Sequence, residues 1–333
     1  MDPCTQGLLG ASLAVLFSTK NNAKKAILCG AIGGISPDLD ILIRSENDPL
    51  MAIEYHRHFT HSLIFVPFGG FISSSFIYIF LKRNLSFRYI FLFTTLGFFT
   101  HGLIDACTSY GTNLYWPFYD LRVAWNVISV VDPIFTIILI ISLSLFLLFK
   151  SANFVRFGLL FSFSYILIGF IQKERVQNFI SEISFKRGHS IEKLLVKPTF
   201  GNNLLWRSIY KTENKYFIDA VFMPFFLDPK FKKGFNSEVI DKENIFPSLY
   251  SNTVQRKDIL RFSYFSNDYI FIHPRYNNVI ADLRYSFLPH DYNSLWGIEI
   301  NTNKPNRHVI FKNFRNFNSS DYEEFWRMIR GKF

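Results

Sequence analysis

Three short segments in the first third of the chain gather side chains that bind metal ions and anions. They are residues 36–40 (SPDLD), 56–63 (HRHFTHSL) and 100–112 (THGLIDACTSYGT). Neutral imidazole nitrogens and carboxylate oxygens are ligands of zinc, and manganese and iron accept them too. Ionisable groups at the end of an apolar segment are costly unless something pairs with them, and a divalent cation is one such partner.

Residues 36–40 place two carboxylates, Asp38 and Asp40, directly after Pro37, a residue that breaks helices. Both carboxylates can serve as metal ligands. Whichever of the two is not a ligand can act as a general base. The alternative is a solvated helix end with capping aspartates.

Residues 56–63 offer three imidazoles within six positions, from His56, His58 and His61. Among them, Arg57 carries a planar guanidinium that suits a phosphate or a carboxylate. A single histidine is more often structural than a ligand. Three at one predicted membrane boundary are as consistent with a metal site as with structural roles.

In residues 100–112, His101 and Asp105 lie four positions apart, which places them on one face of a helix about one turn apart. The pair can supply two ligands to one ion. Alternatively, only the histidine is a ligand, and the aspartate orients its imidazole ring. Further along, Arg122 can bind an anion. The tryptophan and phenylalanine between these residues fit an interfacial aromatic belt better than a catalytic role.

The elements that must position these segments are apolar. Of the 333 residues, 49% are hydrophobic and 40 are phenylalanine. Six uncharged stretches alternate with charged ones: 3–19, 26–37, 62–81, 89–104, 133–149 and 157–172. A span needs about 20 apolar residues, which the third stretch meets outright and the fourth to sixth meet if their polar ends reach the headgroups. The first two are short and glycine-rich and can form a partly inserted hairpin. We expect a mainly α membrane domain at residues 1–172, with about four to six membrane-inserted helices.

Residues 173–333 have a different composition. Charges are frequent, and short runs rich in Ile, Val, Phe and Tyr predict strands at 216–223, 269–273, 279–287, 295–300 and 308–311. Residues 322–333 suit a short amphipathic helix. We expect a soluble α+β domain with a mostly antiparallel sheet, and the sequence leaves its role open.

Basic residues mark one side of the membrane. Three short loops, at 20–25, 82–88 and 150–156, hold eight Lys and Arg residues and no acidic one. By the positive-inside rule they face the cytoplasm, so the three segments and the C-terminal domain are expected on the extracytoplasmic side. The net charge of +10 then reflects contact with membrane lipids. No zinc-finger spacing or RNA-binding aromatic motif is present, so nucleic acid is not an expected partner.

Residues 1–140 resemble the membrane-bound metal-dependent hydrolases, the YdjM-type inner-membrane proteins. The resemblance rests, in chain order, on MDPCTQGLLGA, GAIGGISPDLD, HRHFTHSL, HGLIDACTSYGT followed by WPF, and VDPIFT. In many members a histidine follows the first threonine, whereas Gln6 stands there in this chain and is not counted as a ligand. The family in turn resembles zinc-dependent phospholipase C, an all-helical enzyme with a zinc cluster.

The resemblance implies a bacterial inner-membrane location and metal ligands from all three segments. These ligands are Asp38 or Asp40, His56 or His61, and His101 with Asp105. The phospholipase carries a further HxxxE pair that this chain lacks, so the number of metal ions stays open.

The reaction that fits is hydrolysis by metal-activated water, with zinc as the first choice of metal and manganese or iron also compatible. A lipid or lipid-linked phosphoester suits a site at the bilayer surface. Arg57 and Arg122 would neutralise charge on the phosphoryl group, and Asp40 or Asp38 would act as the base. The alternative is a non-enzymatic membrane protein with a structural metal site, or a role in lipid or ion transport. A structural zinc site is closed by four protein ligands, whereas a catalytic site keeps one position open.

Overall fold

The computed structural model describes all 333 residues, which form two compact units. Unit 1 comprises Met1–Leu42, Tyr55–Ile171 and Phe200–Asn202. Unit 2 comprises Ile43–Glu54, Gln172–Thr199 and Asn203–Phe333. All three segments with metal-binding side chains therefore belong to unit 1.

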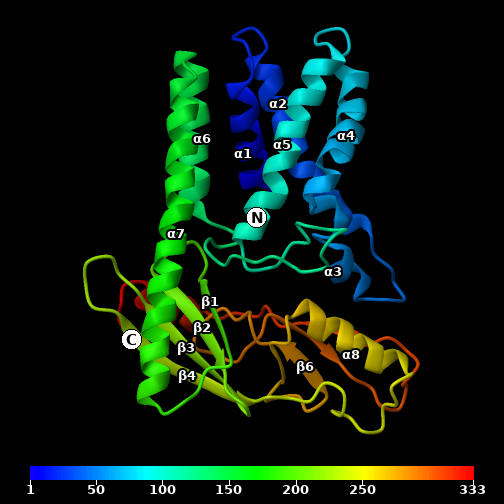
Figure 1. Ribbon diagram of the computed structural model, residues 1–333, viewed down its shortest axis with the longest axis vertical. Helices are drawn as coiled ribbons and strands as arrows, with labels where there is room; N and C mark the ends of the chain where they lie inside the picture. The colour runs from blue at the N-terminus through cyan, green and yellow to red at the C-terminus, as the bar shows by residue number, and fades with distance from the viewer. The chain divides into compact units, whose positions relative to one another are not determined.

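Unit 1 is built from helices that run side by side (Figure 1). They are α1 (Pro3–Leu16), α2 (Ala23–Ile35), α4 (Val66–Leu81), α5 (Phe87–Cys107), α6 (Pro133–Phe149) and the first part of α7 (Asn153–Lys186). Between α2 and α4 the chain forms α3 (Met51–Tyr55) and three 3-10 helices: η1 (Ser36–Leu42), η2 (Phe59–His61) and η3 (Leu63–Phe65).

Three helical segments are long and apolar enough to cross a bilayer: Leu63–Leu81, Phe87–Cys107 and Asn153–Lys186. The helices α1 and α6 are apolar but shorter. The prediction of a mainly helical membrane domain is confirmed, while the number of about four to six inserted helices stays a prediction.

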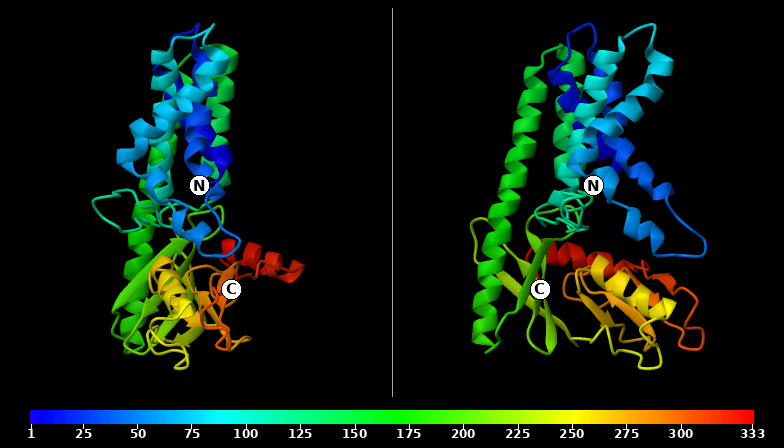
Figure 2. Two further views of the ribbon diagram at one scale, coloured as in Figure 1. Left: turned by 90° about the vertical axis from the view of Figure 1, so that its right-hand side faces the viewer. Right: turned by 45° about the vertical axis from the view of Figure 1, so that its right-hand side comes forward.

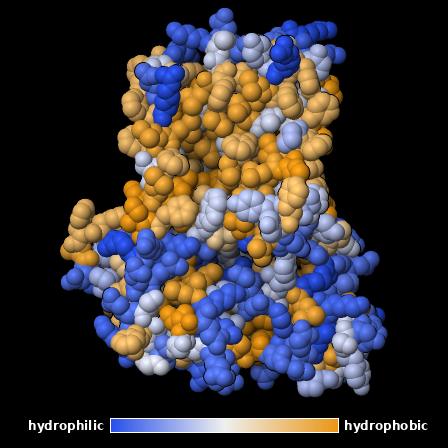
Figure 3. Space-filling view, viewed as in Figure 1, coloured by the Kyte–Doolittle hydropathy of each residue, from blue (hydrophilic) through white to orange (hydrophobic).

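The outward faces of these helices carry large apolar side chains. On α4, Phe68, Ile72, Phe76 and Phe80 follow one another at four-residue spacing, and each is more than 60% exposed. Figure 3 shows such residues as an orange band over the helices. Exposure of a continuous apolar surface to water is unfavourable in free energy, so this face of the helices suits the hydrocarbon core of a bilayer.

The helices α1, α2 and α5 pack with their backbones almost in contact. A β-carbon on Gly97 of α5 would lie 2.1 Å from the carbonyl oxygen of Gly30 on α2, and one on Gly30 would lie 2.5 Å from that of Gly10 on α1. Small residues permit this approach, and the tight packing contributes to helix association in membranes. The packing fixes the end of α5, which carries His101 and Asp105, against α2.

We expect Gly97→Ala to lower the free energy of unfolding by about 3 kcal/mol, the upper end of overpacking costs, because the new methyl group meets rigid backbone. Gly7→Ala is the matched control, since its β-carbon would meet the end of the flexible Ile35 side chain at 3.1 Å. Thermal unfolding of both variants in detergent gives the comparison. Equal melting temperatures would show that the α2–α5 contact tolerates a larger residue.

Unit 2 contains two four-stranded antiparallel sheets, which confirms the antiparallel sheet predicted for the C-terminal region. The first, in strand order β1-β2-β3-β4, consists of β1 (Lys193–Pro198), β2 (Leu205–Lys211), β3 (Lys215–Phe222) and β4 (Lys230–Glu238). The second consists of β5 (Ile270–Ile272), β6 (Val279–Asp282), β7 (Trp296–Glu299) and β8 (Ile310–Asn313). Two helices complete the unit, α8 (Val254–Phe265) and α9 (Ser319–Ile329), and α8 lies beside the second sheet (Figures 1 and 2).

The second part of α7 forms a core with the first sheet. Val176 and Ile180 of α7 are fully buried against Trp206, Tyr210 and Val221. One helix therefore runs from the uncharged stretch 157–172 into the packed core of the first sheet.

Candidate metal centre

His101 is fixed by the backbone of a neighbouring helix. It is fully buried on α5, and its Nδ1 lies 2.5 Å from the carbonyl oxygen of Gly34, near the end of α2. A carbonyl can only accept, so Nδ1 carries a proton and donates it. In the neutral imidazole this leaves a lone pair on Nε2, which is how protein backbones orient histidines toward metal ions.

Ligand atoms from three other residues lie around Nε2 of His101. The nearest are Nε2 of His61 at 2.8 Å, Oδ1 of Asp38 at 3.3 Å and Oδ2 of Asp105 at 3.6 Å. These four atoms all lie within 4.8 Å of one another. Two imidazole nitrogens and two carboxylates can share so small a volume only with protons or a cation among them, so the donor set fits a divalent cation.

Asp40 ties the histidine segment to η1. Its carboxylate accepts from the backbone N–H of Arg57 at 2.9 Å and from the hydroxyl of Thr60 at 2.8 Å. It also lies 2.8 Å from Nδ1 of His56 and 3.2 Å from Nδ1 of His61. Asp40 is buried, so it lies behind both imidazoles and orients them, as outer carboxylates do at metal sites.

A second group of ligand atoms comes from Asp38, Asp40 and His56. It shares Asp38 with the first group, so the side chains can hold one ion or two ions bridged by that carboxylate. The side chains of Asp38 and His56 are 21% and 22% exposed, and they form the accessible edge of an otherwise buried cluster.

Arg57 is the buried cation beside the cluster. Its Nε lies 3.0 Å from Oδ2 of Asp105, and its Nη1 donates to the hydroxyl of Thr108 at 2.9 Å. The guanidinium lies over the ring of Tyr110, 4.8 Å from its centroid. The backbone of Arg57 has φ +62°, in the left-handed region that a bulky residue rarely adopts. Strain of this kind persists only where surrounding contacts impose it, and it gathers at functional sites.

Two other basic or imidazole residues named from the sequence lie outside the ligand groups. Arg122 donates from Nη2 to the carbonyl oxygens of His56 and Gly111, both at 3.1 Å, so it supports the backbone of the ligand segment. The ring of His58 lies against the ring of Trp116, and His58 belongs to neither ligand group.

Gln6 contributes to the site although it was not counted among the site residues from the sequence. It is fully buried on α1, and its Nε2 donates to Oδ1 of Asp105 at 2.9 Å. The Met1 amine lies against the same oxygen. The Oε1 of Gln6 is buried without a hydrogen-bond partner, so this acceptor oxygen is available as a further metal-ligand atom beside the cluster. The only signal in the sequence was its alignment with a histidine in similar proteins.

Comparison with known proteins places this site in a family. Residues 1–176 match the model of the YdjM inner membrane protein family. The chain belongs to this family. The part of the chain that matches the YdjM family, residues 1–176, contains every residue of both ligand groups. The chain is also similar to the uncharacterized protein YfhP of Bacillus subtilis (strain 168). The two are 25% identical over 226 residues, which cover 66% of this chain and 67% of the relative.

No solved structure matches the chain. The likeness to zinc-dependent phospholipase C therefore stays a prediction from motifs, and the site of this YdjM family member has to be judged on its own geometry.

In this YdjM family member, hydrogen bonds between the buried histidines and aspartates of the site shift the pKa values of these groups. Burial lowers the pKa of His61, but hydrogen bonds to Asp105, Asp38 and Asp40 outweigh burial and raise that pKa to about 10. Burial likewise raises the pKa values of Asp38 and Asp40, but hydrogen bonds with the histidines outweigh it and hold both well below their usual range. His61 therefore carries a proton that balances the carboxylates, and a metal ion held by this ring would have to displace that proton.

We expect the affinity of the protein for zinc to rise about tenfold per pH unit around neutral pH, because one proton leaves His61 for each ion bound. The stability of the metal-free protein has the opposite dependence. The stabilisation by His61 is complete below its unfolded pKa of about 6.5 and is lost as the pH rises toward 10. Isothermal titration in buffers of different ionisation enthalpy counts the protons released. His58→Gln should keep the pH dependence, and an affinity that does not change with pH would contradict the assignment.

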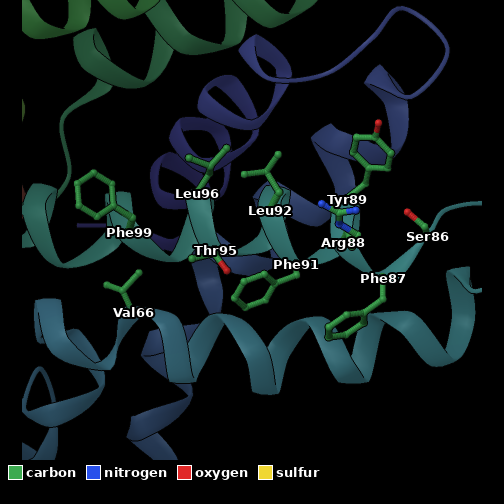
Figure 4. Close-up of a pocket in the computed structure, with 10 residues that line it drawn as sticks. All are labelled: Val66, Ser86, Phe87, Arg88, Tyr89, Phe91, Leu92, Thr95, Leu96 and Phe99. Atoms are coloured by element: carbon green, nitrogen blue, oxygen red, sulfur yellow. The ribbon is translucent and has the colours of Figure 1, made fainter.

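A groove of about 880 Å³ runs along α5 beside α4, away from the ligand atoms (Figure 4). Its lining is largely apolar, from Phe87 and Phe91 at one end to Phe99 and Val66 at the other, and Arg88 is its one charged residue. None of the residues of the two ligand groups lines this groove, so it is separate from both groups.

Proposed function

We propose that this member of the YdjM family is a membrane-bound, metal-dependent hydrolase that acts at the bilayer surface. The observation that carries the proposal is the convergence of Asp38, His61, His101 and Asp105 near the end of an apolar helix long enough to span a bilayer. When bound there, a divalent cation, zinc first and manganese or iron as alternatives, would activate water and polarise the bond that is cleaved.

Residues of the chain would orient the histidine ligands and stabilise negative charge on the substrate. Gly34 and Asp40 keep the protons of the histidine rings on the nitrogens that face away from the cluster. Arg57 keeps a fixed positive charge beside Asp105, which favours an anionic substrate group and stabilises negative charge that develops on it. Arg122 would act as a positioning residue, since its guanidinium holds the His56 carbonyl.

The substrate class follows from the surroundings. The accessible edge of the cluster, at Asp38 and His56, carries polar ligand atoms, whereas the neighbouring helices expose apolar faces. A molecule with a phosphate-bearing head and an apolar anchor matches both, so a phospholipid or another lipid-linked phosphoester is the proposed substrate. The basic loops support a site on the extracytoplasmic side of the inner membrane, and the C-terminal unit is proposed on the same side.

The test is hydrolysis by the purified protein in proteoliposomes. After treatment with a chelator, the protein is reloaded with zinc or manganese and given phospholipids and lipid-linked phosphoesters. We expect release of the headgroup or of phosphate only after reloading, with loss of activity in His61→Ala and retention in His58→Ala. No release from any of these lipids with either metal would overturn the proposal.

One observation favours a second candidate function, a structural metal site. The first ligand group supplies four protein ligands, the number that closes a structural zinc site. Cobalt substitution separates the two functions. An absorption spectrum that changes on addition of a small anion indicates an open position and supports the hydrolase, whereas an unchanged spectrum from a four-coordinate site supports the structural role.

A further inference from the structure

The loop between β3 and β4 exposes three consecutive apolar side chains. Phe226 is 98% exposed, Leu227 is 73% exposed and Phe225 is 48% exposed. They lie within the sequence PFFLDP, residues 224–229, and we refer to residues 225–227 as the apolar tip. Adjacent exposed apolar side chains of this size mark a surface that contacts another apolar phase, because their hydration is unfavourable.

Two hydrogen bonds fix the base of this loop on α7. Gln172 donates from Nε2 to the carbonyl oxygen of Met223 at 2.8 Å, and Arg175 donates from Nη2 to that of Pro224 at 2.9 Å. Figure 1 shows β3 and β4 beside the lower portion of α7. The loop therefore leaves the sheet at the level of residues 172–175.

This level on α7 is a chemical boundary. Gln172 ends the uncharged stretch 157–172, and Lys173, Glu174 and Arg175 follow directly. The apolar part of a spanning helix ends where the helix reaches the lipid headgroups. The base of the loop thus lies at the end of the uncharged stretch of α7, where a spanning helix would reach the headgroups.

The strand that follows the apolar tip is basic. Lys230 and Lys233 are exposed, and the Lys230 ammonium donates one hydrogen bond to the carbonyl oxygen of Gly331 at 2.9 Å. Lys232 pairs with Glu324 at 2.5 Å. Asp228 is the one acidic residue between Met223 and Ser237. Lysines next to aromatic side chains at headgroup level match the phosphates of anionic lipids.

We propose that the apolar tip inserts into the headgroup region of the bilayer beside α7, with Lys230 and Lys233 contacting the phosphates of anionic lipids. The insertion is independent of the proposed hydrolase activity, because none of its residues belongs to the ligand groups. It would give unit 2 a lipid contact of its own, besides the covalent connection through α7.

The test places a fluorescent label at position 226 of the full chain. Cys4, Cys29 and Cys107 are replaced by serine, Phe226→Cys carries an environment-sensitive label, and the protein is reconstituted into phosphatidylcholine nanodiscs. Phe185→Cys is the matched control, since Phe185 is an equally apolar side chain on α7 with 84% exposure, 13 residues beyond Gln172. Melting temperatures equal to that of the cysteine-free parent establish that both labelled proteins are folded.

We expect the label at 226 to emit at shorter wavelength, to be quenched by brominated lipids and to resist aqueous iodide several-fold better than the label at 185. Equal iodide quenching at the two positions would overturn the proposal. Resistance to iodide without quenching by lipid bromines would also overturn it, because the tip would then be covered by protein.

The lysines are tested in the same labelled protein. Adding phosphatidylglycerol to the nanodiscs should increase quenching by brominated lipids, and Lys230→Gln together with Lys233→Gln should abolish that increase. An increase that survives in the double variant would overturn the proposed contact of Lys230 and Lys233 with the lipid phosphates.

Discussion

His101→Ala is expected to reduce the metal content of the purified protein from stoichiometric to near zero. His101 contributes the nitrogen around which the other ligand atoms converge, and its orientation is set by the Gly34 carbonyl. Alanine leaves Asp38, His61 and Asp105 without this shared partner. Three remaining ligands with imposed spacing hold zinc far more weakly than four, so the ion should be lost on dialysis.

Elemental analysis of parent and variant protein, purified side by side, measures this loss. His58→Ala is the matched control, because His58 comes from the same histidine-rich segment and belongs to neither ligand group. Metal retained by the His101 variant, or absent from a well-folded parent after incubation with zinc and manganese, would contradict the assignment of the centre.

Arg57→Ala is expected to lower the free energy of unfolding of the metal-free protein by about 3–5 kcal/mol, the usual cost of breaking a buried ion pair. The substitution leaves the fully buried Asp105 without the guanidinium that lies 3.0 Å from its Oδ2. A divalent cation in the cluster would offer Asp105 another positive partner. The loss should therefore be smaller in protein loaded with zinc.

Arg57→Gly removes the same guanidinium but accepts a φ of +62° without strain. We expect it to be about 1 kcal/mol more stable than Arg57→Ala, so the pair of variants separates the backbone contribution from the charge contribution. Unfolding in detergent, with and without chelator, gives the free energy of unfolding of each of the two variants in the metal-free and metal-loaded states. Equal losses with and without metal would mean that Asp105 does not contact the ion.

Local patterns predicted the parts of the structure that depend on neighbours in the sequence. The uncharged stretch 89–104 lies within α5, and the four-residue spacing of His101 and Asp105 places them on the helix face that meets Asp38. The five predicted strands correspond to β3 and β5–β8. The charged sequences of β1, β2 and β4 gave no alternation of apolar and polar residues, so these strands were missed.

Features that depend on distant contacts could not be predicted. The sequence left open whether Asp40 is a metal ligand or a general base. Its contacts with two imidazoles were not predicted, since they depend on the left-handed turn at Arg57. Composition also placed residues 43–54 with the helices, whereas they group with unit 2. The reason is a set of side-chain pairs: Arg261 of α8 binds Asp48 at 2.9 Å and Glu54 at 2.5 Å.

The hydrogen bond from His101 to the Gly34 carbonyl joins helix packing to ligand geometry. It exists because Gly30 and Gly97 let α2 and α5 approach, and the same approach turns the free nitrogen of the ring toward Asp38. An ion that binds only this arrangement adds its binding free energy to the helix contact. The stability of the α2–α5 contact would then depend on the supply of metal in the cell. In cells short of metal, this protein would be degraded faster.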